Sequence, residues 1–134
     1  MRHLRILASC LLAVLTISCS RIEIVDIPED TLGSKGHIEL AISYEAGKEH
    51  DLALREYEKA IALDPAEPDG HFGIGNIYLI KKEWPAAIKS IEKAVRLRPS
   101  EGLYHNNLAI AYMEAGRFDN GLKATQKGLA LDPV

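Results

Sequence analysis

The sequence predicts an all-α protein made of three helix-turn-helix repeats that stack into a solenoid after an N-terminal export signal. Two observations support this fold class. From Ser34 onward the chain matches itself at an offset of 34 residues, and near the N-terminus a short uncharged stretch follows two arginines. A period between about 20 and 50 residues is typical of stacked repeats, because each repeat buries its apolar face only against its neighbours.

Composition favours a folded domain and disfavours binding to nucleic acid. Of the 134 residues, 47% are hydrophobic and 26% are charged, and the formal net charge is −3. Removal of residues 1–18 would take Arg2 and Arg5 from the 16 basic residues and leave 14 against 19 acidic ones, a charge of −5. Such a surface repels phosphate, and no basic stripe offsets that repulsion.

Residues 1–18 are predicted to be a cleaved signal peptide. Arg2 and Arg5 precede Ile6–Ile17, a run of twelve residues without a charge. A helix needs about 20 apolar residues to cross a bilayer, whereas the apolar part of a signal peptide has about 7–15. Two alternatives stay open: an N-terminal helix buried in the fold, and an uncleaved anchor.

The end of this run, Leu15–Cys19, resembles the lipobox of bacterial lipoproteins, in which a small residue precedes the cysteine that receives the lipid. Cys10 follows a similar sequence, but no adequate apolar region precedes it. The resemblance therefore implies a lipid on Cys19 and stable membrane anchoring by two or more acyl chains. In many bacterial lipoproteins an aspartate after the cysteine signals retention at the inner membrane, so the resemblance and Ser20 together imply the periplasmic face of the outer membrane.

Residues 19–33 are predicted to be the lipidated cysteine and a tether that holds the domain away from the lipid surface. The segment contains Pro28 and four acidic residues and has no clear helical face. An alternative stays open, in which the segment packs against the first repeat as a strand or arm through Ile22, Ile24, Val25 and Ile27.

Three repeats are expected at residues 34–67, 68–101 and 102–134, because residues of one kind recur at equivalent positions. These positions hold Leu40, Ile74 and Leu108; Tyr44, Tyr78 and Tyr112; the rings of His50, Trp84 and Phe118; and Pro65, Pro99 and Pro133.

The spacing resembles the tetratricopeptide repeat, whose pattern is a large residue, Leu-Gly, Tyr, Ala, an aromatic residue, Ala and Pro. The first repeat offers His37, Leu40-Ala41, Tyr44, Ala53, Tyr57, Ala60 and Pro65; the second offers His71, Ile74-Gly75, Tyr78, Ala87, Ile91, Ala94 and Pro99; the third offers His105, Leu108-Ala109 and Tyr112, followed by Gly121, Thr125 and Gly128. The resemblance implies a right-handed α-solenoid that acts as a protein-interaction scaffold, without catalysis and without a cofactor.

Helices are predicted at residues 35–47, 50–63, 68–81, 84–97, 102–115 and 118–131. Small residues such as Ala41, Gly75 and Ala109 let paired helices approach to about 8–10 Å. A proline ends the second helix of each repeat, because it lacks the amide donor and disfavours a helical residue before it. Pro85 falls in the first turn of its helix, where a missing donor costs little.

The resemblance implies that the first helices of the repeats form a concave face that binds a protein or peptide. Relatives that clamp the C-terminal carboxylate of a chaperone use basic residues at several of these positions, and Ile38 and Leu103 stand there in this chain, so an apolar or amphipathic partner is favoured. Asn76 and Asn106 are expected to hold a peptide backbone. In the alternative, Phe72 and its neighbours pack against the N-terminal arm or a second copy. The expected groove residues are Lys35, Ile38, Ile42, Glu45, Ala46, Asp69, Phe72, Asn76, Leu79, Ile80, Leu103, Asn106, Ile110, Met113 and Glu114.

His37, His71 and His105 recur with the repeat period and raise the alternative of a metal site. Equivalent positions on successive repeats lie about 8–10 Å or more apart, whereas zinc needs each nitrogen at about 2.0–2.1 Å. We therefore expect packing histidines and no metal. The chain contains no phosphate-binding loop, nucleophile elbow or HExxH motif, so no enzymatic activity is expected.

Gly121 and Gly128 are expected to weaken the last helix, since glycine costs about 1 kcal/mol relative to alanine inside a helix. No polar helix is expected to cap the stack, so Leu122, Leu129 and Leu131 should be partly uncovered. Either this end frays, or a partner or a second copy of the chain covers it as a homodimer.

These features lead to one hypothesis and two alternatives. The hypothesis is a lipid-anchored adaptor that supports assembly of an envelope complex such as a type IV pilus or a secretion system, a role that rests on family resemblance alone. The alternatives are a cytosolic scaffold with an uncleaved N-terminal helix, and a metal-binding protein that uses the histidines.

Overall fold

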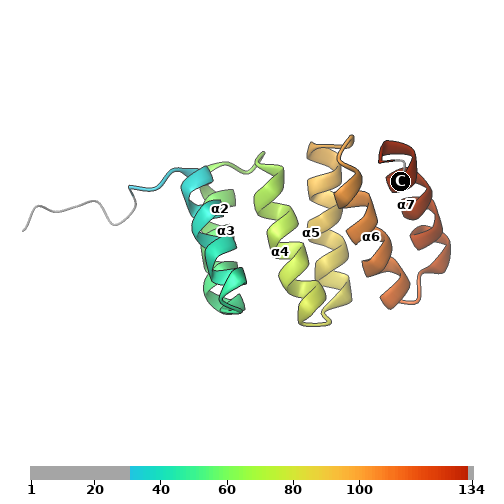
Figure 1. The fold of residues 1–134 in the computed structure, drawn as a ribbon, viewed down its shortest axis with the longest axis horizontal. Coiled ribbons are helices and arrows are strands. Elements are labelled where there is room, and N and C mark those ends of the chain that lie inside the picture. Colours follow the sequence, from blue (N-terminus) through green and yellow to red (C-terminus); the bar gives the residue numbers. More distant parts are fainter. Residues whose placement is uncertain (1–30, 133–134) are drawn as a thin grey trace, which may run out of the picture. The chain divides into compact units, whose positions relative to one another are not determined.

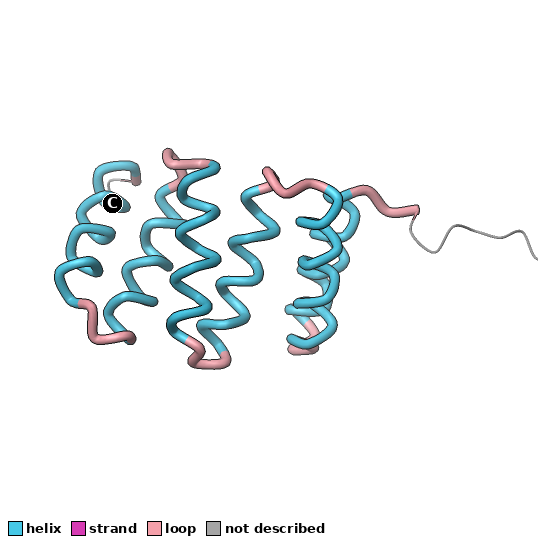
Figure 2. The backbone as a smooth tube through the Cα atoms, turned by 180° about the vertical axis from the view of Figure 1, so that it is seen from behind, coloured by secondary structure: helices cyan, strands magenta, loops and turns pink. Residues whose placement is uncertain are grey.

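The computed structural model describes residues 31–132, so the expected signal peptide, Cys19 and most of the tether lie outside it. The described residues contain helices and no strand (Figures 1 and 2). The helices are α2 (Ser34–Ala46), α3 (His50–Leu63), α4 (Pro68–Ile80), α5 (Trp84–Leu97), α6 (Gly102–Glu114) and α7 (Phe118–Leu131). Every boundary agrees with the predicted one to within one residue, which confirms the all-α fold class. None of these helices is long and apolar enough to span a bilayer.

The helices form three antiparallel pairs, α2 with α3, α4 with α5 and α6 with α7, in chain order (Figure 1). Each pair packs on the next through α3 with α4 and through α5 with α6. The first helices also contact one another in succession, α2 with α4 and α4 with α6, whereas the second helices do not. The first helices are therefore closer together, and they line the concave side of the stack.

Two clusters of buried residues form the core, and Tyr78 packs partly against both of them. Alanines hold the places where the helices are closest, since Ala41, Ala53 and Ala60 have no exposed surface. The cluster of α2 to α4 contains Ile38, Ala41, Ala53, Tyr57, Ala60, Ile74 and Ile77; the cluster of α5 to α7 contains Ala87, Ile88, Ile91, Leu108, Ala109, Ala111, Tyr112 and Ala124.

Two of the three recurring histidines connect neighbouring repeats. Nε2 of His71 donates a hydrogen bond to the Pro65 carbonyl oxygen at 3.0 Å, and Nε2 of His105 donates one to that of Pro99 at 2.9 Å. Each bond ties the first helix of one repeat to the turn that closes the repeat before it. His37 instead donates from Nδ1 to the Glu56 carboxylate at 2.7 Å. Within residues 31–132, no group of three or more His, Cys, Asp or Glu side chains is arranged to hold a metal ion.

Glycines in α4 and α7 accept side chains from neighbouring helices. A Cβ atom on Gly73 would lie 2.2 Å from Cζ of Tyr57, so the ring rests directly on the α4 backbone. A Cβ on Gly128 would lie 2.1 Å from Oδ1 of Asn106. The helix α7 continues to Leu131, and its glycines make room for side chains of α6. The expectation that Gly121 and Gly128 weaken this helix did not include these contacts.

Each helix pair turns through a residue with left-handed backbone at the same repeat position: Lys48 with φ 61°, Lys82 with φ 60° and Gly116 with φ 73°. The amide of each donates a hydrogen bond to a carbonyl oxygen of the preceding helix. Glycine adopts this conformation freely, whereas an L side chain costs roughly 1–2 kcal/mol there. Two of the three turns therefore contain a strained lysine.

Replacement of Lys82 by glycine should raise the free energy of unfolding by up to about 1 kcal/mol, because it removes this strain. Gly116→Ala should lower the same quantity by a similar amount. Urea denaturation followed by circular dichroism measures both. Lys35→Gly, in the first turn of α2, serves as the control and should destabilise by up to about 1 kcal/mol. A Lys82→Gly variant less stable than the wild type would contradict this account of the turn.

Gly73→Ala should lower the free energy of unfolding by about 1–3 kcal/mol, because the new methyl group overlaps the Tyr57 ring. Alanine is otherwise the better helix former by about 1 kcal/mol, so the sign of the effect tests the contact. Gly47→Ala is the matched control, since its Cβ would have no contact closer than 3.4 Å. Equal stability of the two variants would show that Tyr57 does not rest on Gly73.

Candidate functional site

A line of exposed apolar side chains marks the first helices. Ile42 of α2, Ile80 of α4, and Leu103, Ile110 and Met113 of α6 are each about half exposed, and we call these five residues the concave strip. All five belong to the groove positions expected from the sequence. Apolar side chains grouped on an exposed face are typical of a protein-binding surface.

The first hollow of the concave side, about 260 Å³ in volume, lies between α2 and α4. Six of its eight lining residues are groove residues expected from the sequence, and the others are Tyr57 and Gly73. The tertiary structure therefore brings together groove positions that the sequence separates by a whole repeat. The lining residues are Ile38, Ile42, Glu45, Tyr57, Asp69, Phe72, Gly73 and Asn76.

A second hollow, about 340 Å³ in volume, is formed by α6 with one residue of α7. Its apolar part comes from two members of the concave strip, Ile110 and Met113, and its only charged group is Glu114. The complete lining consists of Asn106, Ala109, Ile110, Met113, Glu114 and Thr125.

Glu45 carries one of the two carboxylates that line the first hollow, and it is partly buried there. Burial raises its pKa above the ordinary value, and a hydrogen bond from Tyr57 and the charge of His50 oppose this shift only in part. The Tyr57 hydroxyl donates that bond to Oε2 of Glu45 at 3.1 Å. Burial and the neighbouring carboxylate raise the pKa of Tyr57 in turn, so the hydroxyl keeps its proton. The repeat pattern identifies Tyr57 as a packing residue and gives no sign of this bond.

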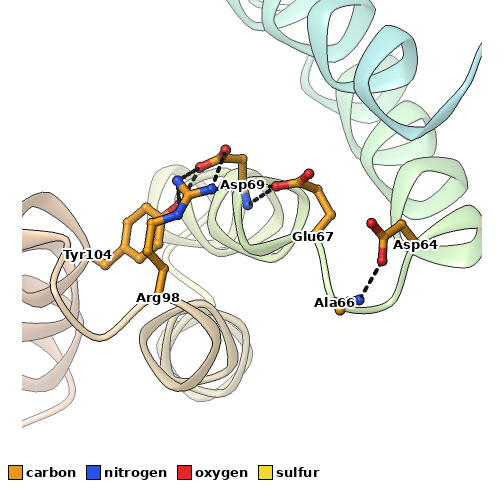
Figure 3. A network of polar contacts seen from close by, with 6 residues as sticks. All are labelled: Asp64, Ala66, Glu67, Asp69, Arg98 and Tyr104. Carbon is orange, nitrogen blue, oxygen red and sulfur yellow. Dashed lines mark hydrogen bonds and ion pairs between the residues drawn. The ribbon is translucent and has the colours of Figure 1, made fainter.

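Asp69, also a predicted groove residue, is held by a network at the start of α4 (Figure 3). The Arg98 guanidinium donates to both of its carboxylate oxygens, at 2.9 and 3.2 Å, and the Tyr104 hydroxyl donates to the same carboxylate. Burial acts to raise the pKa of Asp69, but the hydrogen bonds from Tyr104 and Arg98 outweigh it and lower the pKa below the ordinary value. The carboxylate thus stays ionised, and its hydrogen-bonding capacity is used by the fold.

The turn that leads into α4 supports this network (Figure 3). The amide of Ala66 donates to Oδ1 of Asp64 at 3.0 Å, and Glu67 accepts from the amide of Asp69 at 3.4 Å. The sequence carries a signal for the network: Arg98 occupies the repeat position that holds aspartate, Asp64 or Asp132, in the other two repeats.

Of the two asparagines expected to hold a peptide, Asn76 is already engaged. Its Oδ1 accepts a hydrogen bond of 2.8 Å from Nδ2 of Asn107, which links α4 to α6. Asn106 is exposed at the second hollow. The Phe72 ring lies against Tyr104 with ring centroids 4.5 Å apart. The remaining groove residues line neither hollow: Lys35, Ala46, Ile80 and Leu103 are exposed, and Leu79 packs partly against the core.

A third hollow, about 400 Å³ in volume, is lined by residues of the second helices α3 and α5 and by residues of α4. Lys89, Lys93 and Arg96 line it together with Ile61 and other residues. Its apolar residues are partly or fully buried, whereas the concave strip is about half exposed. The apolar side chains of the concave strip are therefore more exposed than those that line this hollow.

Comparison with known proteins identifies the fold. Two profiles of the tetratricopeptide repeat family match residues 38–102 and 102–133. A search of curated protein sequences finds no match. A crystal structure of MamA has a TM-score of 0.72 and 24% identity over 77% of this chain and 60% of that chain. A MamA structure designated AMB-1 has a TM-score of 0.69 and 28% identity over 80% and 61% of the two chains.

The first TPR of Spaghetti (RPAP3), bound to the HSP90 peptide SRMEEVD, has a TM-score of 0.74 and 21% identity over 78% of this chain and 82% of that chain. The chain spans about three fifths of the MamA chains that it matches. The two matched segments run without a gap from α2 into the residues after α7. This chain belongs to the tetratricopeptide repeat family, whose members are protein-interaction scaffolds.

Proposed function

We propose that this chain is an adaptor that binds an apolar or amphipathic segment of a partner protein along its concave side, while a lipid on Cys19 anchors it in the bacterial cell envelope. The concave strip is the observation that carries the proposal. Full burial of one aliphatic side chain contributes about 1.5–3 kcal/mol, so a half-exposed one contributes about 1 kcal/mol. One anchor is too weak to hold a partner, so the segment must extend along the stack and contact several of them.

The chemistry of the groove favours an apolar partner over an acidic C-terminus. The Spaghetti (RPAP3) domain holds the acidic peptide SRMEEVD. In this chain Ile38 and Leu103 stand at groove positions where a basic residue would bind a carboxylate. We therefore expect no measurable binding of SRMEEVD to this chain.

Anchoring is proposed from the N-terminal sequence. Leu15–Cys19 resembles the lipobox, and Ser20 favours the outer membrane, with the repeats on its periplasmic face. An adaptor fixed there would recruit or stabilise a component of an envelope assembly, such as a pilus or a secretion complex.

Ile42→Glu and Ile110→Glu, each made singly, should weaken partner capture by the full chain at least about tenfold, which corresponds to about 1.4 kcal/mol. Chemical crosslinking in the producing cells, followed by quantitative mass spectrometry, measures the capture. Leu63→Glu on α3 is the matched control, because Leu63 and Ile42 are both 54% exposed. It should leave capture unchanged, because Leu63 is not a groove residue. Partners that are lost equally with all three variants, or with none of them, would rule out the groove.

Labelling with a radioactive fatty acid tests the anchor. The wild-type chain should incorporate the label, Cys19→Ser should abolish incorporation, and Cys10→Ser should retain it as the matched control. A wild-type chain that takes up no label would remove the lipid anchor and leave a cytosolic scaffold as the better description.

A further inference from the structure

Charge is distributed unevenly between the two sides of the stack. The first helices carry one basic residue, Lys35, against four acidic ones: Glu39, Glu45, Asp69 and Glu114. The second helices carry seven basic residues and five acidic ones. The basic residues are Arg55, Lys59, Lys89, Lys93, Arg96, Lys123 and Lys127, and the acidic ones are Asp51, Glu56, Glu58, Glu92 and Asp119. The helices that bear the groove are thus negative, while the helices behind them are positive.

Glu45 and Asp69 line the same hollow but differ in what neutralises them. Asp69 forms an ion pair with Arg98 at 2.9 Å. Among residues 31–132, no lysine or arginine lies within ion-pair distance of Glu45, and its hydrogen bond comes from the neutral Tyr57 hydroxyl. Partial removal of a carboxylate from water is unfavourable, and burial raises the pKa of Glu45 because the Tyr57 hydrogen bond and the charge of His50 offset it only in part.

The residues around Glu45 suit the chemistry of a long cationic side chain. Ile38, Ile42 and Phe72 line the same hollow and offer apolar contact to an aliphatic stem, while the carboxylate accepts from the charged head. The second hollow repeats the arrangement, with Ile110 and Met113 beside Glu114. Apolar surface is therefore paired with one available carboxylate in each hollow.

We infer that the partner segment carries lysine or arginine among its apolar anchors, and that Glu45, which lines the first hollow together with Ile42 and Phe72, receives one of these cations. The inference rests on the proposed function of the groove and names the chemistry of its ligand. Charge complementarity supports it, because a cationic ligand stabilises Glu45, whereas an acidic one would meet repulsion from Glu45 and Glu114.

The test uses a library of random peptides displayed on phage and selected on the full chain. Selected peptides should be rich in apolar residues with lysine or arginine. Each is then synthesised with its own sequence and with its basic residues replaced by glutamine, and both forms are titrated against the wild type and Glu45→Gln. Glutamine keeps an acceptor for the Tyr57 hydroxyl, so this variant should melt at the wild-type temperature.

The four affinities form a double-mutant cycle. Removal of the peptide's charge should weaken binding at least about tenfold on the wild type and much less on Glu45→Gln, because the two groups then no longer interact. Added salt should weaken only the charged peptide, since exposed parts of the contact are screened. Leu63→Glu should bind both peptide forms as the wild type does.

Three results would overturn the inference, and they are distinguishable. Peptides that require Ile42 but show no coupling between their charge and Glu45 would leave the groove in place and remove its preference for cations. Acidic peptides that ignore Ile42→Glu and are lost with Lys89→Glu and Lys93→Glu would move binding to the hollow between α3 and α5. A selection without any peptide sensitive to Ile42→Glu would contradict the proposed function as well.

Discussion

Close contact between paired helices is the constraint on which the rest of this structure depends. Ala41, Ala53 and Ala60 are completely buried where the helices meet, and any larger side chain there would push them apart. The helices therefore pack tightly within each pair, and tyrosine and isoleucine fill the remaining space. Because the first helices also contact one another, the stack curves and the concave side forms along α2, α4 and α6. The groove is thus a consequence of how the pairs pack.

The fold itself uses some of the polar residues of the concave side and leaves others for a ligand. Asp69 is bound by Arg98 and Tyr104, and the side-chain oxygen of Asn76 accepts from Asn107. Glu45 keeps only a neutral donor within hydrogen-bonding distance. Two acidic side chains of the groove therefore have different roles, since an arginine forms an ion pair with Asp69 and no lysine or arginine of residues 31–132 does so with Glu45.

Sequence reasoning located the ends of the helices to within one residue, because a proline follows the second helix of each repeat and the repeat period shows where the next helix begins. It also placed Ile42, Glu45 and Phe72 in one groove, since the repeat period fixes which positions share a face. It did not foresee that Gly73 would carry the Tyr57 ring, or that Arg98 would bind Asp69. Those contacts join residues of different repeats, and their formation depends on the distance and rotation between neighbouring helices. Neither quantity can be read from spacing alone.

The sequence by itself determined the number of repeats, the ends of the helices and the positions that are equivalent from one repeat to the next, because backbone sterics and the repeat period can be read along the chain. Only the tertiary structure decided which acidic residues of the groove form an ion pair with a basic residue of the same chain. An ion pair requires two side chains to meet in space, and Arg98 reaches Asp69 across 29 residues of chain. The tertiary structure thus decided that Glu45 lies beside apolar side chains with no lysine or arginine of residues 31–132 at ion-pair distance.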